Sequence, residues 1–459
     1  MVRRANAALQ NRKRNPQEQI CRLTVSDGGI AQRILSQSLQ ICRLDRGTGK
    51  EFWFIIMPVR DKTRPTRLLF VQTQAEMAGA QEISRILGAG LSRPGPAGEP
   101  ACEVHHLFLY RKSPGCDDFP NVHFAATERP RSALDAARFL FRLVSLMRRI
   151  DADVVLPFQH YGNIVTAPLA RLFGARRIVA NHVSAPATIS GPVRLIDKWL
   201  GLLGFYDVMT VNSHATWQDY MAYPPRYRNR IVYVPHGFSR KAPTLGKAAA
   251  RRHFGIPADV TLLGTVARLH PLKRIDLAIG QLTRLPDLHL AIAGQGPDGE
   301  RLRAIATELK VEDRVHFLGE LHPDEIGNVL ACLDIFVFPS AAETFGLAAV
   351  EAADAGVPVI ATDMPVMREV LRVDGEDCAV FADVTDPAAF TRAIRTLTDD
   401  PATCERLSHL GRRLGALHSL DAMVDCYRDL VAGRALALPL RENGPAEAKD
   451  TPPVAEMPP

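Results

Sequence analysis

Residues 336–364 constrain the fold of this chain more than any other stretch, and they read FVFPSAAETFGLAAVEAADAGVPVIATDM. The apolar run before Pro339 predicts a buried strand, and residues 347–355, rich in Ala, Leu and Glu, predict a helix. Gly356 stands where a glycine commonly follows a helix, and residues 357–362 predict the next buried strand. Strand, loop, helix and strand in this order favour a parallel sheet covered by helices.

Two carboxylates flank the start of the predicted helix. Glu343 lies in the loop before it, and Glu351 lies about one turn inside it. Because the first-turn N–H groups of a helix are unpaired and the helix dipole is positive there, this place favours an anion. Carboxylates instead accept hydrogen bonds from hydroxyl groups. A site for phosphate together with a polyol indicates a sugar nucleotide as ligand. The alternative, which has equal weight, is that both glutamates are solvent-exposed residues of an ordinary βαβ unit without a binding role.

Composition excludes several classes of protein. The chain has 459 residues, enough for two or three domains, and its net charge of +6 is mild. The sequence contains no basic stripe with interleaved aromatic residues, so it does not predict nucleic-acid binding. The eight cysteines form no CxxC pair and have no histidines at zinc spacing, so we expect reduced thiols and a cytoplasmic protein. No apolar run approaches the ~20 residues of a membrane span, and no signal peptide is evident.

Strands and helices alternate twice along the chain. The first alternation starts at Arg67, with an expected glycine loop over residues 78–82, and the second starts at Thr261 after a basic connection at 238–259. We therefore expect an N-terminal extension in residues 1–64, a first Rossmann-like domain in 65–240, a second in 241–415, a helix in 416–438 whose return to the first domain is left open, and a disordered tail in 439–459. The two doubly wound domains should face each other across a cleft, because ligands bind beyond the carboxyl ends of such strands.

Two cations follow the first strand of the second domain. Arg268 comes directly after the strand, and Lys273 is expected to open the next helix. The planar guanidinium and the point charge of the lysine suit a diphosphate. Gly294 follows another strand of the same domain. Alternatively, Arg268 and Lys273 are surface charges without a binding role. The presence of Glu343 and Glu351 in the same domain makes this alternative less favoured.

These residues carry a resemblance to a known family. ETFGLAAVE, from Glu343 to Glu351, matches the E-x-F-G-x4-E pattern of the retaining glycosyltransferases with the GT-B fold, the group 1 or family 4 class. TVARLHPLK at 265–273 and AGQGP at 293–297 resemble two further segments of that family. The resemblance covers residues 67 to 436 and is most specific over 261–370. The chain departs from the family at Ala267, where glycine is usual before the arginine.

The resemblance implies a role for each matching residue. Arg268 and Lys273 would hold the donor diphosphate, Glu351 the ribose, and Glu343 the transferred sugar. The implied catalytic residues are Glu343, His182, Arg268 and Lys273, with His160 as the rival of His182. The implied donor-binding residues are Arg268, Lys273, Gly294, Phe345, Gly346, Leu347, Glu351 and, in the first domain, Gly79.

The implied activity is the transfer of a hexosyl group from a nucleotide sugar to a saccharide or lipid-linked acceptor, with retention of anomeric configuration, in polysaccharide or glycolipid biosynthesis. We expect no metal site and no cofactor beside the donor substrate. Three alternatives stay open: a nucleotide-sugar epimerase or a phosphorylase of the same fold, and a nucleotide-sugar-binding protein without turnover. The sequence names neither the sugar nor the acceptor.

Two segments of the first domain are both basic and apolar. These are the predicted helix 132–149 and the segment 193–205, which reads VRLIDKWLGLLGF. Together they could form a surface that rests on the inner face of an anionic membrane and meets a lipid-linked acceptor. Core-facing helices with a solvated basic side are the alternative, which the sequence slightly favours.

Overall fold

The computed structural model describes residues 64–184, 188–434 and 436, together with the backbone of three short strands nearer the N-terminus. Residues 1–65 form a unit of their own. In it, β1 (Cys21–Thr24) pairs in parallel with β2 (Gln40–Asp45), which pairs antiparallel with β3 (Glu51–Ile56). The predicted tail at 439–459 lies outside the described residues.

The first large domain is built on a seven-stranded parallel sheet in the order β10-β9-β8-β7-β4-β5-β6. Its strands are β4 (Arg67–Ala75), β5 (Glu103–Arg111), β6 (Val122–Ala126), β7 (Val154–Pro157), β8 (Arg177–His182), β9 (Val208–Val211) and β10 (Ile231–Tyr233). Its helices are α2 (Gly79–Leu91), α3 (Ala133–Ile150), α4 (Gln159–Leu172), α5 (Gly191–Leu203), α6 (His214–Asp219) and α7 (Pro225–Arg228), with a 3-10 turn η2 (Pro114–Cys116).

The second large domain is built on a six-stranded parallel sheet in the order β13-β12-β11-β14-β15-β18. Its strands are β11 (Thr261–Val266), β12 (Leu288–Ala293), β13 (Val315–Gly319), β14 (Ile335–Phe338), β15 (Val359–Thr362) and β18 (Val380–Ala382). Its helices are α8 (Lys247–His253), α9 (Ile275–Gln281), α10 (Gly299–Glu308), α11 (Ile326–Cys332), α12 (Leu347–Asp354), α13 (Pro365–Val370), α14 (Pro387–Asp399), α15 (Pro401–Gly411) and α16 (Leu414–Leu417). The hairpin β16 (Arg372–Val373) and β17 (Glu376–Asp377) and the 3-10 turns η4 (Pro271–Lys273), η5 (Glu312–Arg314) and η6 (Pro323–Glu325) complete it.

Both sheets are buried on both faces, which explains their continuous apolar strands. Leu68, Leu69, Phe70 and Val71 of β4 are all fully buried, with alternate side chains packed in two separate apolar clusters. The side chains of the second sheet are likewise divided between two apolar clusters, one on each face. Each domain is therefore a three-layer sandwich of helices, sheet and helices, as the alternation in the sequence predicted.

The strand order reverses once in each sheet. β4 lies between β5 and β7 in the first sheet, and β11 lies between β12 and β14 in the second. The loops that follow the two central strands run in opposite directions, so a crevice opens at this point of an open α/β sheet. The predicted site residues of the second domain follow β11, β12 and β14, the three strands around the switch point of the second sheet.

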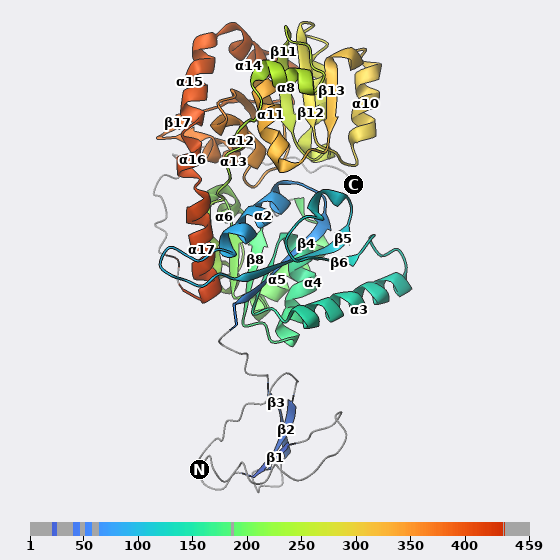
Figure 1. The fold of residues 1–459 in the computed structure, drawn as a ribbon, viewed down its shortest axis with the longest axis vertical. Coiled ribbons are helices and arrows are strands. Elements are labelled where there is room, and N and C mark those ends of the chain that lie inside the picture. Colours follow the sequence, from blue (N-terminus) through green and yellow to red (C-terminus); the bar gives the residue numbers. More distant parts are fainter. Residues whose placement is uncertain are drawn as a thin grey trace. The chain divides into compact units, whose positions relative to one another are not determined.

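The last helix, α17 (Leu420–Ala432), packs against the first domain, although it follows the second in the chain (Figure 1). Met423, Val424 and Tyr427 join the apolar cluster that contains Ile83 of α2. The Tyr427 hydroxyl donates a hydrogen bond of 2.6 Å to Asn181 Oδ1 at the end of β8. The C-terminal helix thus links the two domains. Within the described part of the chain, no helix is both long and apolar enough to cross a membrane.

The opening segment of the sequence folds as predicted, but two predictions elsewhere, at 78–82 and at Lys273, are corrected. α12 begins at Leu347, and Gly356 after it has φ +82°. The expected glycine loop at 78–82 is instead the first turn of α2, because only Ala78 stays extended and Gly79 already has helical geometry. Lys273 lies in the turn η4 and does not open α9. The connection at 238–259 contains α8, which packs on α11.

Candidate functional site

A cavity of about 390 Å³ lies between the two large domains, lined by loops at the carboxyl ends of the strands. The first domain contributes residues 77–83 after β4, with Gln159, Asn212 and His236 after later strands. The second domain contributes residues that follow β11, β12, β13 and β14, among them all those predicted from the sequence in this domain: Arg268, Lys273, Gly294, Glu343, Phe345, Gly346, Leu347 and Glu351. Gly79 also lines the cavity.

Lys273 and Glu343 form an ion pair in the cavity. Their loops are fastened together, since the N–H of Ala341 donates to the carbonyl of Leu272 over 2.8 Å. The Lys273 ammonium also lies 5.4 Å from the centre of the Phe338 ring, within range of a cation–π interaction. The lysine is thus held at the edge of the cavity, where an anion could take the place of the carboxylate.

Two helices begin at the cavity without a side-chain cap. At the start of α12, Gly346 takes the left-handed conformation with φ +77°, and no side chain accepts from the first turn. A Cβ at Gly346 would lie 2.7 Å from the sulfur of Met367, so the position requires glycine. Ala78 and Gly79 at the start of α2 have no side-chain cap either. The free N–H groups of two helices therefore face one cavity, an arrangement that favours an anion.

Glu351 is buried in the wall of the cavity, and one of its oxygens, Oε1, has no hydrogen-bond partner. Lys241 lies 3.7 Å from this oxygen and 2.5 Å from Glu82 Oε1 on α2. Arg85 donates to both oxygens of Glu82, at 2.8 and 2.9 Å. Burial raises the pKa of Glu351 to about 7, with Lys241 opposing and Glu82 adding to the rise. A buried carboxylate with an oxygen that accepts no hydrogen bond, in a cavity wall, is suited to accept from a ligand hydroxyl.

The raised pKa of Glu351 makes stability depend on pH. The carboxyl would titrate near 4.5 in the unfolded chain and titrates near 7 in the folded one. Between these values the folded state holds a proton that the unfolded state has lost, so stability should fall as pH rises through this window. Glu351→Gln should match the wild type at pH 4.5 and be more stable by about 1–3 kcal/mol at pH 8. Urea unfolding of the ligand-free protein at both pH values measures this, and equal differences at both would contradict it.

Gly294 keeps the loops after β11 and β12 in contact. It has φ +130°, and a Cβ there would lie 2.0 Å from the carbonyl oxygen of Ala267. Gly294→Ala should therefore destabilise the protein by about 2–4 kcal/mol, from overpacking and backbone strain together. Gly280→Ala is the matched control, because nothing lies within 4 Å of that Cβ in α9, and it should stabilise by about 0.5–1 kcal/mol. Denaturant unfolding of both variants measures the change in the free energy of unfolding. A Gly294→Ala protein as stable as the wild type would contradict the predicted clash with Ala267.

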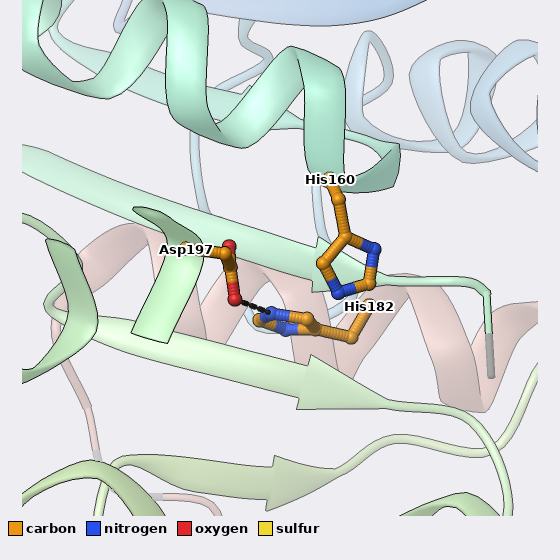
Figure 2. A group of neighbouring side chains, drawn as sticks. All are labelled: His160, His182 and Asp197. Carbon is orange, nitrogen blue, oxygen red and sulfur yellow. Dashed lines mark hydrogen bonds and ion pairs between the residues drawn. The ribbon is translucent and has the colours of Figure 1, made fainter. Parts of the chain in front are cut away.

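The structure contradicts the expected position of His182. Its side chain is 1% exposed and points into the interior, where Nε2 lies 3.2 Å from Asp197 Oδ2 (Figure 2). The next residues, Val183 and Ser184, line the cavity, but the imidazole does not. Successive side chains along a strand point to opposite faces of the sheet. The sequence did not show which face the side chain of His182 takes. His160 is buried beside it, so neither histidine faces the cavity.

His160, His182 and Asp197 are close enough to one another to hold a metal ion, but they fit a hydrogen-bonded network better. Both oxygens of Asp197 already accept, from Tyr206 over 2.9 Å and from Tyr227 over 2.8 Å. Burial raises the pKa of Asp197, but His182, His160 and the hydrogen bond from Tyr227 together bring it below its usual value. An ion would have to replace these bonds. The cluster instead fastens β8 to α5 behind the cavity.

Several polar residues of the cavity were not singled out as site residues from the sequence, among them Asn212, Thr344 and Lys241. Asn212, after β9, donates to Thr344 Oγ1 over 3.2 Å, and Thr344 donates to the carbonyl of Val183 over 3.3 Å. Lys241 contacts Glu351 as described above. Thr344 lies within the motif from Glu343 to Glu351, and Lys241 lies in the predicted connection at 238–259, but their partners are more than 100 residues away.

Comparison with known proteins shows what the second domain resembles. Residues 246–414 match the family described as glycosyl transferases group 1. The D-inositol 3-phosphate glycosyltransferase of Mycolicibacterium smegmatis is 33% identical over 274 residues, which are 56% of this chain and 59% of that protein. The O-antigen biosynthesis glycosyltransferase WclY of Escherichia coli is 29% identical over 197 residues, 43% of this chain and 53% of the relative. The chain spans between about half and two thirds of the length of such curated relatives.

Solved structures show the same fold. HepE of Anabaena, solved in complex with UDP-glucose, superimposes with a TM-score of 0.67 at 18% identity, over 80% of this chain and 99% of that one. WaaG, a glycosyltransferase involved in lipopolysaccharide biosynthesis, gives a TM-score of 0.59 at 15% identity, over 80% and 100%. The two facing Rossmann-like domains are therefore the GT-B fold that the sequence predicted. The match over residues 246–414 shows that the second domain is similar to the group 1 glycosyltransferases.

Proposed function

We propose that the protein transfers a hexosyl group from a nucleotide sugar to a saccharide or lipid-linked acceptor, with retention of anomeric configuration. The observation that carries this proposal is the convergence of Arg268, Lys273, Glu343 and Glu351 on one cavity between the two domains. Cations, free helix N-termini and carboxylates together match the diphosphate, ribose and sugar of such a donor. The curated relatives named above, which are glycosyltransferases, support the same class of reaction.

The mechanism follows from where charge develops. When the bond between the sugar and the phosphate breaks, the leaving nucleoside diphosphate gains negative charge. Arg268, Lys273 and the start of α12 would stabilise that charge, because they are fixed before the reaction and need no reorganisation. Glu343 would stabilise the positive charge on the sugar ring, and Glu351 would hold the ribose. We propose that this reaction needs neither a metal ion nor a further cofactor, and unchanged transfer after treatment with EDTA would support that.

A mass-spectrometric screen tests the activity. The protein is incubated with a panel of nucleotide sugars and with saccharide and polyprenyl-phosphate-linked acceptors, and glycosylated acceptor is the expected product. Formation of an epimerised sugar without acceptor, or of a sugar phosphate from inorganic phosphate, would instead identify an epimerase or a phosphorylase. Binding of a nucleotide sugar without any product would identify a binding protein. The biosynthetic setting proposed is polysaccharide or glycolipid assembly at the cytoplasmic side of a membrane.

A surface of the first domain supports contact with a membrane. Nine of the eleven large apolar side chains that are exposed in the described part of the chain belong to α3, α4 and α5, which pack side by side. Phe141 is 76% exposed and Trp199 is 55% exposed. None of the residues 133–142, the first ten of α3, is buried. The sequence slightly favoured core-facing helices here, and the exposure of these side chains supports the opposite interpretation.

The charges of this surface suggest the kind of membrane. Arg138, Arg142, Arg149 and Arg194 are exposed on the same helices as the apolar side chains. Aromatic and aliphatic side chains with arginines between them are typical of elements that lie in the interface of an anionic bilayer. We propose that α3 and α5 rest on such a bilayer and bring the cavity to a lipid-linked acceptor.

Phe141→Ser and Trp199→Ser should each lower binding to vesicles that contain phosphatidylglycerol by about tenfold, because each removes roughly 1.5–3 kcal/mol of apolar burial. Sedimentation of the protein with these vesicles measures the effect, and phosphatidylcholine vesicles should bind much less. Leu309→Ser is the matched control, an exposed apolar side chain of the second domain. Lack of wild-type binding to anionic vesicles at low salt would contradict the membrane proposal.

A further inference from the structure

Two carboxylates cross between the large domains beside the proposed phosphate site. Glu76, at the end of β4 in the first domain, lies 3.4 Å from Nη1 of Arg268 in the second domain. Glu320, after β13 in the second domain, accepts from the N–H of Met77 over 3.4 Å and from the hydroxyl of Ser113 over 3.2 Å in the first. The two contacts are reciprocal and adjacent, because residues 76 and 77 are neighbours in the chain.

Each carboxylate is also anchored within its own domain. Glu76 is 3% exposed, and both of its oxygens accept from Lys112 Nζ, at 2.8 and 2.9 Å. Gln74 Nε2 donates to Glu76 as well, over 3.0 Å. The second oxygen of Glu320 accepts from the amide of Gln295. A buried carboxylate that accepts three hydrogen bonds from Lys112 and Gln74 cannot follow Arg268 if the domains separate, so this contact requires their present spacing.

The cluster leaves room for a donor phosphate. Glu76 does not line the cavity, whereas Arg268 does, so the carboxylate holds the guanidinium from behind. The planar guanidinium has five N–H donors in a fixed fork, and a contact at one edge orients the others. Lys112 and Arg268 together carry one positive charge more than Glu76 carries negative charge. The group therefore remains attractive to an anion.

We propose that Glu76 is a positioning residue that orients Arg268 toward the donor diphosphate, and that Glu320 holds the two domains at the spacing this orientation requires. The inference rests on the proposed function, since it assigns the diphosphate to Arg268. It predicts that the phosphate site is complete only when the domains are closed. Opening the cleft breaks the contacts of both carboxylates at once and releases the guanidinium.

Equilibrium binding of two probes tests the role of Glu76. Uridine diphosphate and uridine, or the guanosine pair if the wild type binds those, are titrated into the wild type, Glu76→Gln and Glu103→Gln. Glu103 is the control, because it pairs with Arg67 over 2.9 Å inside the first domain. Glu76→Gln should weaken the diphosphate about tenfold and leave the nucleoside unchanged. Tighter binding of the diphosphate would show that Glu76 is only a competing anion, and equal losses for both probes would show a general structural role; either result overturns the proposal.

Small-angle X-ray scattering of the ligand-free proteins tests the domain spacing without any reference to activity. Glu76→Gln and Glu320→Gln should each increase the radius of gyration, and Glu103→Gln should not. If the wild type binds no nucleotide, the proposed function fails while the scattering result still stands on its own. An unchanged radius for both crossing variants overturns the proposal whether or not the protein is a transferase. Far-ultraviolet circular dichroism shows whether each variant is folded. If Glu76→Gln does not fold, Glu320→Gln alone tests the domain spacing.

Discussion

Replacing Glu343 by alanine is expected to lower the rate of sugar transfer by about 100-fold or more, while the affinity for the nucleoside diphosphate stays the same or rises. Losses of this size follow the removal of one fixed electrostatic partner of a transition state. The affinity should not fall, because Glu343 pairs with Lys273 and its removal frees that cation for the diphosphate. A lower kcat with unchanged binding would place Glu343 at the sugar half of the donor.

Two measurements on the same variant separate this account from a loss of folding. Initial rates at saturating donor give kcat, and calorimetric titration of the nucleoside diphosphate gives the dissociation constant. Glu312→Ala is the control, an exposed glutamate of the second domain outside the cavity. Undiminished transfer by Glu343→Ala would remove this carboxylate from the mechanism. Loss of nucleotide binding together with activity would place it at the wrong end of the donor.

Lys273→Gln should raise the dissociation constant for nucleoside diphosphates by about 10- to 100-fold. Hydrogen bonds to charged groups contribute about 1.5–3 kcal/mol, and each 1.4 kcal/mol is a factor of ten. Arg268→Gln should have an effect of similar size on the same ligand. Neither change should weaken the binding of the nucleoside alone, because that ligand lacks the phosphates.

The neighbouring cation supplies the control for this prediction. Arg274 adjoins Lys273 in sequence, has a side chain 36% exposed, and pairs with Asp276 at 3.6 Å. It does not line the cavity, so Arg274→Gln should bind the diphosphate as the wild type does. A general effect of charge on the approach of the anion would weaken both variants equally and fade with salt. Equal losses for Lys273→Gln and Arg274→Gln would therefore contradict a specific phosphate contact.

The sequence predicted those parts of the site that depend on local pattern. The strand before Pro339, the helix from Leu347 and the glycine after it follow from apolar periodicity and backbone requirements. The parallel sheet then places residues after β11, β12 and β14 at one edge, which brought Arg268, Gly294 and Glu343 together before any coordinates were known. Local propensity also misled, because Gly79 was expected in a loop and instead begins α2.

The rest of the site depends on contacts that no local pattern encodes. Glu76 and Arg268 are 192 residues apart, and Met77 and Glu320 are 243 apart. Such pairs meet only once two separately folded domains face each other. The face of the sheet taken by His182 likewise depends on Asp197 and Tyr227, whose positions are set by α5 and α7. The exposure of Phe141 depends on where the sheet ends beneath α3.

A crystal structure of the protein with an intact nucleotide sugar tests the central claim most directly. The account predicts the diphosphate between Arg268 and Lys273 at the start of α12, the ribose hydroxyls within hydrogen-bonding distance of Glu351, and the sugar beside Glu343. It also predicts that the ion pair between Lys273 and Glu343 is broken in the complex. A nucleotide sugar bound outside this cavity, or bound within it with its phosphates away from both cations, would contradict the account.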